Sequence, residues 1–170
     1  PPPAIAFSVS LAFAAGRMSE APSSLSRASG YRFPENVVEC RFRYRVRYAE
    51  TDQMGTFYNA RALEWFEVGR SELSRAMGLP YTEWEKRGAY LPLVESYVRY
   101  LGPASYDEEL EMRVGVEAAG RAKLRFHNEV HKVADGAPVC RGYTLHMVVD
   151  DGLRPCRLPD WARAMVEPDR

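Results

Sequence analysis

The sequence predicts an α+β domain in which one long helix lies against an antiparallel sheet. Three observations lead to this prediction. Apolar and basic residues alternate from Val38 to Tyr48, apolar residues then recur at helical spacing from Asn59 to Met77, and four further strand-like runs follow without a second long helix. Turn signals separate these runs, as is typical of an antiparallel meander.

The first run has the period of a half-buried strand. Its apolar positions are every second residue, and basic residues occupy most of the positions between them: Val38, Cys40, Phe42, Tyr44, Val46 and Tyr48 against Arg41, Arg43, Arg45 and Arg47. Successive side chains of a strand point to opposite faces of the sheet. One face of this strand should therefore be buried and the other basic.

The helical run carries signals at both ends. Asn59 is a candidate N-cap, and Gly78 with Pro80 just beyond it is a candidate stop. The apolar face of the run is narrow: Ala62, Trp65, Phe66, Gly69, Leu73, Ala76 and Met77. We predict a helix over 59–77.

The remaining chain predicts a short helix at 81–87 and strands near 90–101, 108–118, 122–133 and 138–150. One helix cannot cover both faces of five strands. The sheet should therefore curl around the helix, and its open edge should pair with a second subunit.

Composition narrows the possible partners. The 170 residues contain 23 Lys+Arg and 23 Asp+Glu, so no global field recruits nucleic acid or an anionic membrane. Cys40, Cys140 and Cys156 form no C-x-x-C pair, which argues against a disulfide framework and a zinc site. We expect a cytoplasmic protein without metal or cofactor, whose partner is a small molecule or a second copy of itself.

Residues 1–33 have a different composition. The apolar stretch 4–15 lacks a basic n-region and is too short to span a bilayer, and Pro, Ser and Ala then dominate up to Gly30. Such a segment cannot bury a core. We predict a disordered leader over 1–33, translated from an upstream start because Met18 is itself a sensible start, with a cleaved export signal as the alternative. Residues 34–170 would form one domain.

The turn between the first strand and the long helix is the candidate site. Asp52 ends the strand, and Gly55 lies in the turn before the helix start. A carboxylate facing the positive end of a helix dipole is suited to attack an acyl group and to stabilise the oxyanion that forms. An aspartate needs no activating partner for this at neutral pH. The alternative is that Asp52 is only a turn residue, since Asp-x-x-Gly suits type I turns.

Two segments resemble a known family. The first begins with Arg-Val, followed after four residues by Thr-Asp and after two more by Gly, and it then runs through an aromatic turn into a helix that contains Trp-Phe-Glu. The second is Tyr-Leu-Gly-Pro-Ala-Ser-Tyr-Asp at 100–107. A short Arg-Leu-Pro segment at 157–159 closes the match. Together they are similar to the 4-hydroxybenzoyl-CoA thioesterase-like branch of the hotdog superfamily, over residues 38–165. That resemblance implies a hotdog fold, with one long central helix wrapped by a curved five- to six-stranded antiparallel sheet.

The resemblance also implies an activity. It is hydrolysis of an acyl-CoA thioester by a homodimer or a homotetramer built as a dimer of dimers, with active sites at subunit interfaces. Asp52 matches the family's catalytic acid, as nucleophile or general base, and the backbone N–H of Asn59 matches the oxyanion donor. Many members of this branch carry His where this chain has Asn59, so a role that needs an imidazole there is not implied.

Further candidates surround the acid, each with a plainer alternative. Tyr58, Phe57 and Trp65 could line an acyl pocket, although Tyr58 could equally close the core. Glu67 could point toward the site or pair with Arg70. Arg121 and Lys123 follow a glycine turn where a CoA phosphate could bind, and solvated charge is the alternative.

Two rival functions are compatible with the same fold. A hydratase or dehydratase would need a histidine paired with the acid, and a non-catalytic acyl-CoA-binding protein would need no acid. The chain has three histidines, His127, His131 and His146, all on late strands and without a Gly-x-Ser-x-Gly elbow. The spacing of His127 and His131 could suggest a metal, but we expect both to be surface residues.

Overall fold

The computed structural model describes residues 31–167. Residues 1–30, which make up most of the predicted leader, lie outside the described residues. The order of elements is β1 (Val38–Arg45), η1 (Tyr48–Glu50), α1 (Arg61–Ala76), α2 (Tyr81–Lys86), β2 (Leu93–Tyr100), β3 (Glu109–Ala118), β4 (Lys123–Lys132), β5 (Pro138–Met147) and α3 (Asp160–Val166).

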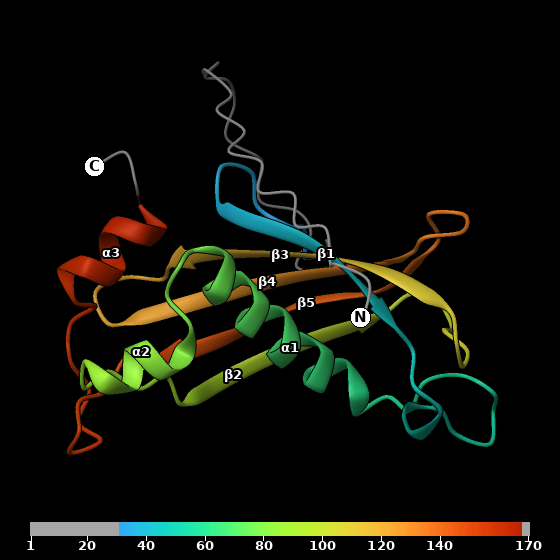
Figure 1. Cartoon of the computed structure of the whole chain (residues 1–170), viewed down its shortest axis with the longest axis horizontal. Coiled ribbons are helices and arrows are strands. Elements are labelled where there is room, and N and C mark those ends of the chain that lie inside the picture. Colours follow the sequence, from blue (N-terminus) through green and yellow to red (C-terminus); the bar gives the residue numbers. More distant parts are fainter. Residues whose placement is uncertain (1–30, 168–170) are drawn as a thin grey trace, which may run out of the picture.

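The strands form one antiparallel sheet in the order β1-β3-β4-β5-β2, and α1 runs along one face of it (Figure 1). The predicted α+β arrangement, with a long helix against a five-stranded antiparallel sheet, is confirmed. Three sequential hairpin neighbours, β3, β4 and β5, form the centre, while β1 and β2 are the edges.

Helix α1 packs closely on the sheet through Gly69. A Cβ placed on this residue would lie 2.8 Å from Val114 Cγ2 and 2.9 Å from Asn128 Oδ1. Around this contact the helix buries Ala62, Trp65, Phe66 and Leu73 against the inward side chains of the central strands, among them Leu110, Met112, Leu124, Phe126 and Val130. Its opposite side, with Leu63, Glu64, Glu67 and Arg75, is exposed in the single protomer.

The helix ends differ from the prediction on one side only. Gly78 has φ +75°, and the N–H groups of Gly78 and Leu79 donate to the carbonyls of Arg75 and Ser74 at 2.9 Å, so the predicted stop is confirmed. The predicted N-cap is wrong. The N-cap is Ala60 without a side-chain hydrogen bond, because Asn59 belongs to a turn in which Arg61 N–H donates to Tyr58 O at 2.9 Å.

Two other boundaries depart from the sequence prediction. The first strand stops at Arg45 rather than Tyr48, because residues 48–50 form the short 3₁₀ turn η1. The periodicity did not predict α3, a short helix that follows Pro159, although proline before an acidic first turn is a start signal. The short helix after Pro80 and the other four strands occur where they were predicted.

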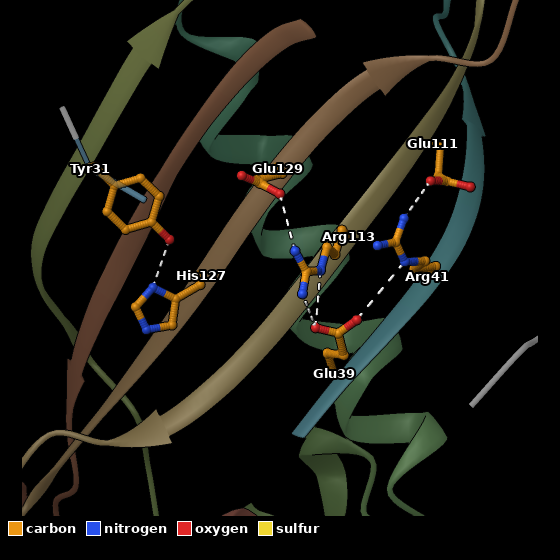
Figure 2. A network of polar contacts seen from close by, with 7 residues as sticks. All are labelled: Tyr31, Glu39, Arg41, Glu111, Arg113, His127 and Glu129. Carbon is orange, nitrogen blue, oxygen red and sulfur yellow. Dashed lines mark hydrogen bonds and ion pairs between the residues drawn. The ribbon is translucent and has the colours of Figure 1, made fainter. Parts of the chain in front are cut away.

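Charged side chains on the outer face link β1 to the centre of the sheet (Figure 2). Arg41 Nη1 lies 2.8 Å from Glu111 Oε1, and Arg113 Nη2 lies 2.6 Å from Glu39 Oε2. Arg113 also approaches Glu129 at 3.5 Å. The arginines of β1 are thus paired within the fold, mainly with acidic residues of β3, while Glu129 of β4 pairs with Arg113.

The segment before β1 lies on the same outer face. Phe33 is buried, with the Arg113 guanidinium 4.0 Å from its ring centroid, and the Tyr31 hydroxyl is 2.6 Å from His127 Nδ1 (Figure 2). Residues 31–33, the last three of the predicted leader, thus lie on the sheet. Two aromatic side chains bury enough apolar area on the sheet to order this segment.

The histidines are less exposed than predicted. His127 is buried, because Tyr31 and Phe33 cover it, and burial lowers its pKa. His146 is buried on β5, where its Nδ1 lies 2.8 Å from the Leu91 carbonyl oxygen. Only His131 is partly exposed, so the prediction of surface histidines was wrong for His127.

Neither a membrane-spanning helix nor a metal-binding cluster occurs within residues 31–167. No helix there is both long and apolar enough to cross a membrane. No group of three or more His, Cys, Asp or Glu side chains in that range could hold a metal ion.

The approach of β2 to β5 yields a first prediction. A Cβ on Gly142 would lie 1.9 Å from the carbonyl oxygen of Tyr97, which is backbone and cannot move away cheaply. Gly142→Ala should therefore destabilise the fold by about 3 kcal/mol, at the upper end of overpacking costs, and lower Tm by roughly 6–12 °C in circular-dichroism melting. Thr82→Ala, on the exposed surface of α2, is the control and should change stability by less than ~0.5 kcal/mol. An unchanged Tm for Gly142→Ala would contradict this strand pairing.

The buried imidazole of His146 yields a second prediction. The pKa of His146 is lowered from 6.5 to about 4, chiefly because the imidazole is buried and also because of the charge of Arg70, while the bond to the Leu91 carbonyl opposes the shift. Between these two values the unfolded chain binds a proton that the folded chain does not, so stability falls as pH decreases through this window. We expect His146→Gln to be less stable at pH 8 but to lose less stability from pH 7 to 4.5, by up to about 1.4 kcal/mol per pH unit in urea titrations. Parallel pH profiles for the two proteins would refute this assignment.

Candidate active site

The loop between η1 and α1 is closed by backbone hydrogen bonds across it. Thr51 and Phe57 form an antiparallel bridge, Asp52 N–H donates to Thr56 O at 2.9 Å, and Tyr58 N–H donates to Glu50 O at 2.8 Å. At the tip, Gly55 N–H donates to Asp52 O at 3.0 Å, and Gly55 has φ +74°, a backbone conformation that glycine adopts readily. The two arms of the loop are therefore held side by side.

The Asp52 carboxylate has one oxygen bonded and one free. Its Oδ1 accepts the Met54 N–H at 2.8 Å, as in an Asx turn, and the residue is partly exposed. Within residues 31–167, its Oδ2 has no hydrogen-bond partner. The local turn role is thus real, and it leaves an oxygen able to react.

The chain that enters α1 presents two backbone donors. The N–H groups of Asn59 and Ala60 have no acceptor among the described residues, whereas those of Arg61, Ala62 and Leu63 are bonded. Asn59 is held in place through its own carbonyl, which accepts the Tyr100 hydroxyl at 2.8 Å. Unbonded N–H groups at a helix start attract negative charge. Sequence reasoning singled out Asn59 but not Ala60.

The second motif, at 100–107, lies directly against this loop. Phe57 N–H donates to the Ala104 carbonyl at 2.8 Å, and Ala104 N–H donates to the Thr56 hydroxyl at 3.0 Å. The rings of Tyr48 and Tyr106 meet edge to face, with centroids 5.5 Å apart. Two segments that are some 50 residues apart in the sequence therefore build one site.

The three aromatic candidates have different environments. Tyr58 is 52 % exposed, so its ring does not close the core of this protomer. Phe57 and Trp65 are both buried, with ring centroids 4.7 Å apart. Trp65 exposes no surface in the single chain, and its indole N–H is bonded to a carboxylate beneath the loop.

That carboxylate belongs to Glu50, which sequence reasoning missed. Glu50 is only 1 % exposed and accepts hydrogen bonds from Tyr44, Arg47 and Trp65. Burial alone would raise its pKa, but these hydrogen bonds outweigh burial and hold the pKa below its ordinary value. The strand periodicity gave no signal for it, because β1 ends at Arg45 and Tyr48, two residues before Glu50, is exposed.

Glu67 has a hydrogen-bond partner on its own helix, and Arg121 and Lys123 lie away from the Asp52 loop in this protomer. Glu67 is exposed and accepts the Ser71 hydroxyl at 3.0 Å rather than pairing with Arg70, whose guanidinium lies 5.3 Å from the Tyr81 ring centroid. Lys123 begins β4, close to Arg121, at the end of the sheet near α3, opposite the end with the Asp52 loop (Figure 1).

Arg121 lines a cavity of about 370 Å³. The other lining residues are Arg157, Leu158, Asp160 and Arg163. The Arg121 carbonyl accepts the Leu158 N–H at 2.8 Å, which fixes the β3–β4 turn against the segment that leads into α3. The closing Arg-Leu-Pro motif is therefore part of this arginine-rich cavity.

Residues 46–166 match the family model described as the thioesterase-like superfamily. YneP of Bacillus subtilis (strain 168), provisionally named an acyl-CoA thioesterase, is 34 % identical over 124 residues, which cover 70 % of this chain and 89 % of that protein. A DHNA-CoA thioesterase structure from Staphylococcus aureus has a TM-score of 0.68 at 28 % identity and covers 74 % of this chain and 87 % of that one.

A structure of a 4-hydroxybenzoyl-CoA thioesterase variant with 4-hydroxybenzoyl-CoA bound also superposes, with a TM-score of 0.68. It covers 76 % of this chain and 99 % of that one, and at 17 % identity it establishes the likeness of the fold alone. The family match extends over the Asp52 loop, α1, the 100–107 segment and α3. The chain therefore belongs to the thioesterase-like superfamily, in the 4-hydroxybenzoyl-CoA thioesterase-like branch of the hotdog fold.

Proposed function

We propose that this chain is an acyl-CoA thioesterase, which hydrolyses an acyl-CoA to the free acid and CoA. One observation carries the proposal: a partly exposed carboxylate with a free oxygen, Asp52, shares a closed loop with the unbonded N–H groups of Asn59 and Ala60. The family and the thioesterase names of relatives support it.

Asp52 would act on the thioester carbonyl in one of two ways. Its free oxygen attacks the carbonyl carbon and expels the CoA thiolate, leaving an anhydride that water hydrolyses. Alternatively, the carboxylate takes a proton from a water molecule that attacks the same carbon. Both routes place negative charge on the carbonyl oxygen, and the Asn59 and Ala60 N–H groups are the donors offered to it.

No histidine is needed for either route. A carboxylate is already ionised near neutral pH, and a thiolate is a good leaving group. The three histidines lie on β4 and β5, where His127 is covered by Tyr31 and His146 is bonded to Leu91. An imidazole at position 59 is therefore dispensable, since the donor there is the main chain.

The acyl group would bind beside Tyr58 on the exposed side of the loop. Trp65 has no exposed surface, so we assign it a supporting role beneath Phe57 instead of direct contact. Glu67 is exposed on α1, the helix that carries Trp65, and is a candidate to contact the substrate across a subunit boundary.

We propose that the enzyme is a homodimer or a dimer of dimers in which the β2 edges pair. Leu93, Val94 and Tyr100 on this edge are 52 %, 50 % and 48 % exposed, which is unusual for an apolar strand left without a partner. A two-fold axis would run the two β2 strands antiparallel. The end of β2 that holds Asn59 through Tyr100 would then lie beside the start of the partner's β2.

This arrangement would unite the two ends of the sheet in one site. Leu93, at the start of β2, pairs with His146 on β5, and His146 pairs with Leu124, next to Lys123. The partner's Lys123 and its arginine cavity would therefore approach the Asp52 loop. Guanidinium groups bind phosphate oxygens well, so we assign Arg121, with Arg157 and Arg163, to the phosphates of CoA.

The first functional prediction concerns Asp52. Asp52→Asn keeps the bond to Met54 but removes the charge, so kcat on the best acyl-CoA of a panel should fall by at least ~10²-fold while KM changes little. CoA release is followed with a thiol reagent. Asp135→Asn is the matched control, because Asp135 Oδ1 accepts the Ala137 N–H at 2.9 Å in a similar turn, and it should retain full activity. Activity within threefold of wild type for Asp52→Asn would refute the proposed mechanism, and absence of CoA release by the wild type would refute the function.

The second functional prediction tests the shared site. Arg121→Glu should raise KM without changing kcat much, because it opposes phosphate binding. Mixed dimers of Asp52→Asn and Arg121→Glu contain one site with both changes and one intact site. Random mixing should therefore give about a quarter of the wild-type sites at low substrate, by two-fold symmetry. If both groups act within one protomer, mixing will restore nothing.

A further inference from the structure

We propose that Glu50 is a positioning residue of the active site, which fixes Asp52 and the Asn59 N–H relative to each other. The inference rests on the proposed thioesterase function and adds to it a residue that neither the motif nor the mechanism used. It follows from the contacts of the Glu50 side chain and of its backbone.

The side chain of Glu50 connects three elements. Its Oε1 accepts the Tyr44 hydroxyl from β1, the Arg47 Nη2 at 2.8 Å from the turn before η1, and the Trp65 Nε1 at 3.1 Å from α1. Its Oε2 accepts the Arg47 backbone N–H at 2.7 Å. Four donors thus hold one carboxylate, which ties α1, through Trp65, to the end of β1.

The backbone of Glu50 continues this connection into the loop. Its carbonyl accepts the Tyr58 N–H at 2.8 Å, which places the second arm of the loop one residue before Asn59. The first arm leads to Asp52 two residues later. Displacing Glu50 would therefore move both the acid and the oxyanion donor.

Glu50 does not act on the substrate itself. It is 1 % exposed, and both of its oxygens are already hydrogen-bonded. A solvent-shielded acid with this many donors cannot reach a thioester carbonyl. Its influence must pass through the residues that it holds.

Burying a carboxylate here costs desolvation free energy that an apolar side chain would not. Replacing a buried charged group and its partners by well-packed apolar residues is often neutral or stabilising. Unlike an apolar side chain, a carboxylate forms directional hydrogen bonds, which fix each donor at a defined angle and distance. Misplacement of a catalytic group by about 1 Å can reduce the rate by ~10²-fold, so this directional control has a kinetic consequence.

The test is Glu50→Gln, which keeps the size of the side chain and removes its charge. We expect kcat with the best acyl-CoA to fall by ~10–10²-fold, while KM stays within about threefold of wild type. The assay is run at least ~15 °C below the Tm of the variant, so that the measured protein is folded. By the usual scaling of Tm with stability, this temperature difference corresponds to a free energy of unfolding of several kcal/mol. Glu39→Gln is the matched control: Glu39 also accepts from an arginine, at 2.6 Å, but on the outer face of β1. It should leave kcat unchanged.

Two milder variants keep the test decisive if Glu50→Gln does not fold. Tyr44→Phe and Trp65→Phe each remove one donor to Glu50, and each should lower kcat by a smaller factor without raising KM. Their effects should not add to that of Glu50→Gln, because the donors act through the same carboxylate.

Several outcomes would overturn the inference. Full kcat in folded Glu50→Gln would do so, as would full kcat in Tyr44→Phe and Trp65→Phe, or a loss equal to that of Glu39→Gln. Failure of the proposed function looks different, since the wild type would then release no CoA, and failure of the proposed mechanism would leave Asp52→Asn active. An inactive Asp52→Asn together with a fully active Glu50→Gln would refute only the proposed role of Glu50.

Discussion

The packing of α1 on the concave face of the sheet is the constraint on which the rest of the structure depends. Gly69 allows the helix backbone to approach Val114 and Asn128 more closely than any larger residue would permit. The helix then fills the curve of the sheet with Trp65, Phe66 and Leu73, and its start meets the end of β1. The Asp52 loop is the short connection between these two fixed points.

Hydrolytic chemistry at such a site requires few side chains. In the proposed mechanism a carboxylate, two main-chain donors and a good leaving group suffice, so the fold would supply position in place of a catalytic triad. Main-chain donors are also tolerant of substitution. An asparagine at position 59 can offer the same N–H as any other residue, provided that Tyr100 and the helix keep its peptide in place.

Charged side chains are paired on the outer face of the sheet but gathered around the cavity near α3. On the outer face, arginines and glutamates of β1, β3 and β4 pair across the strands (Figure 2). Around the cavity near α3, by contrast, three arginines face one aspartate of the lining. A nearly neutral protein can therefore hold a local site for an anion, which net charge does not reveal.

Local sequence predicted most of the elements and marked Asp52 as the candidate acid. Period-two and helical spacing predicted β1 and α1, Gly78 predicted the helix stop, and the Thr-Asp-x-x-Gly motif singled out Asp52, because these signals arise from neighbours a few residues apart. Tertiary structure decided the rest. Burial of Glu50 and His127, the contact between the 100–107 segment and the loop, and the separation of Arg121 from Asp52 all depend on contacts between distant residues, which no local pattern encodes.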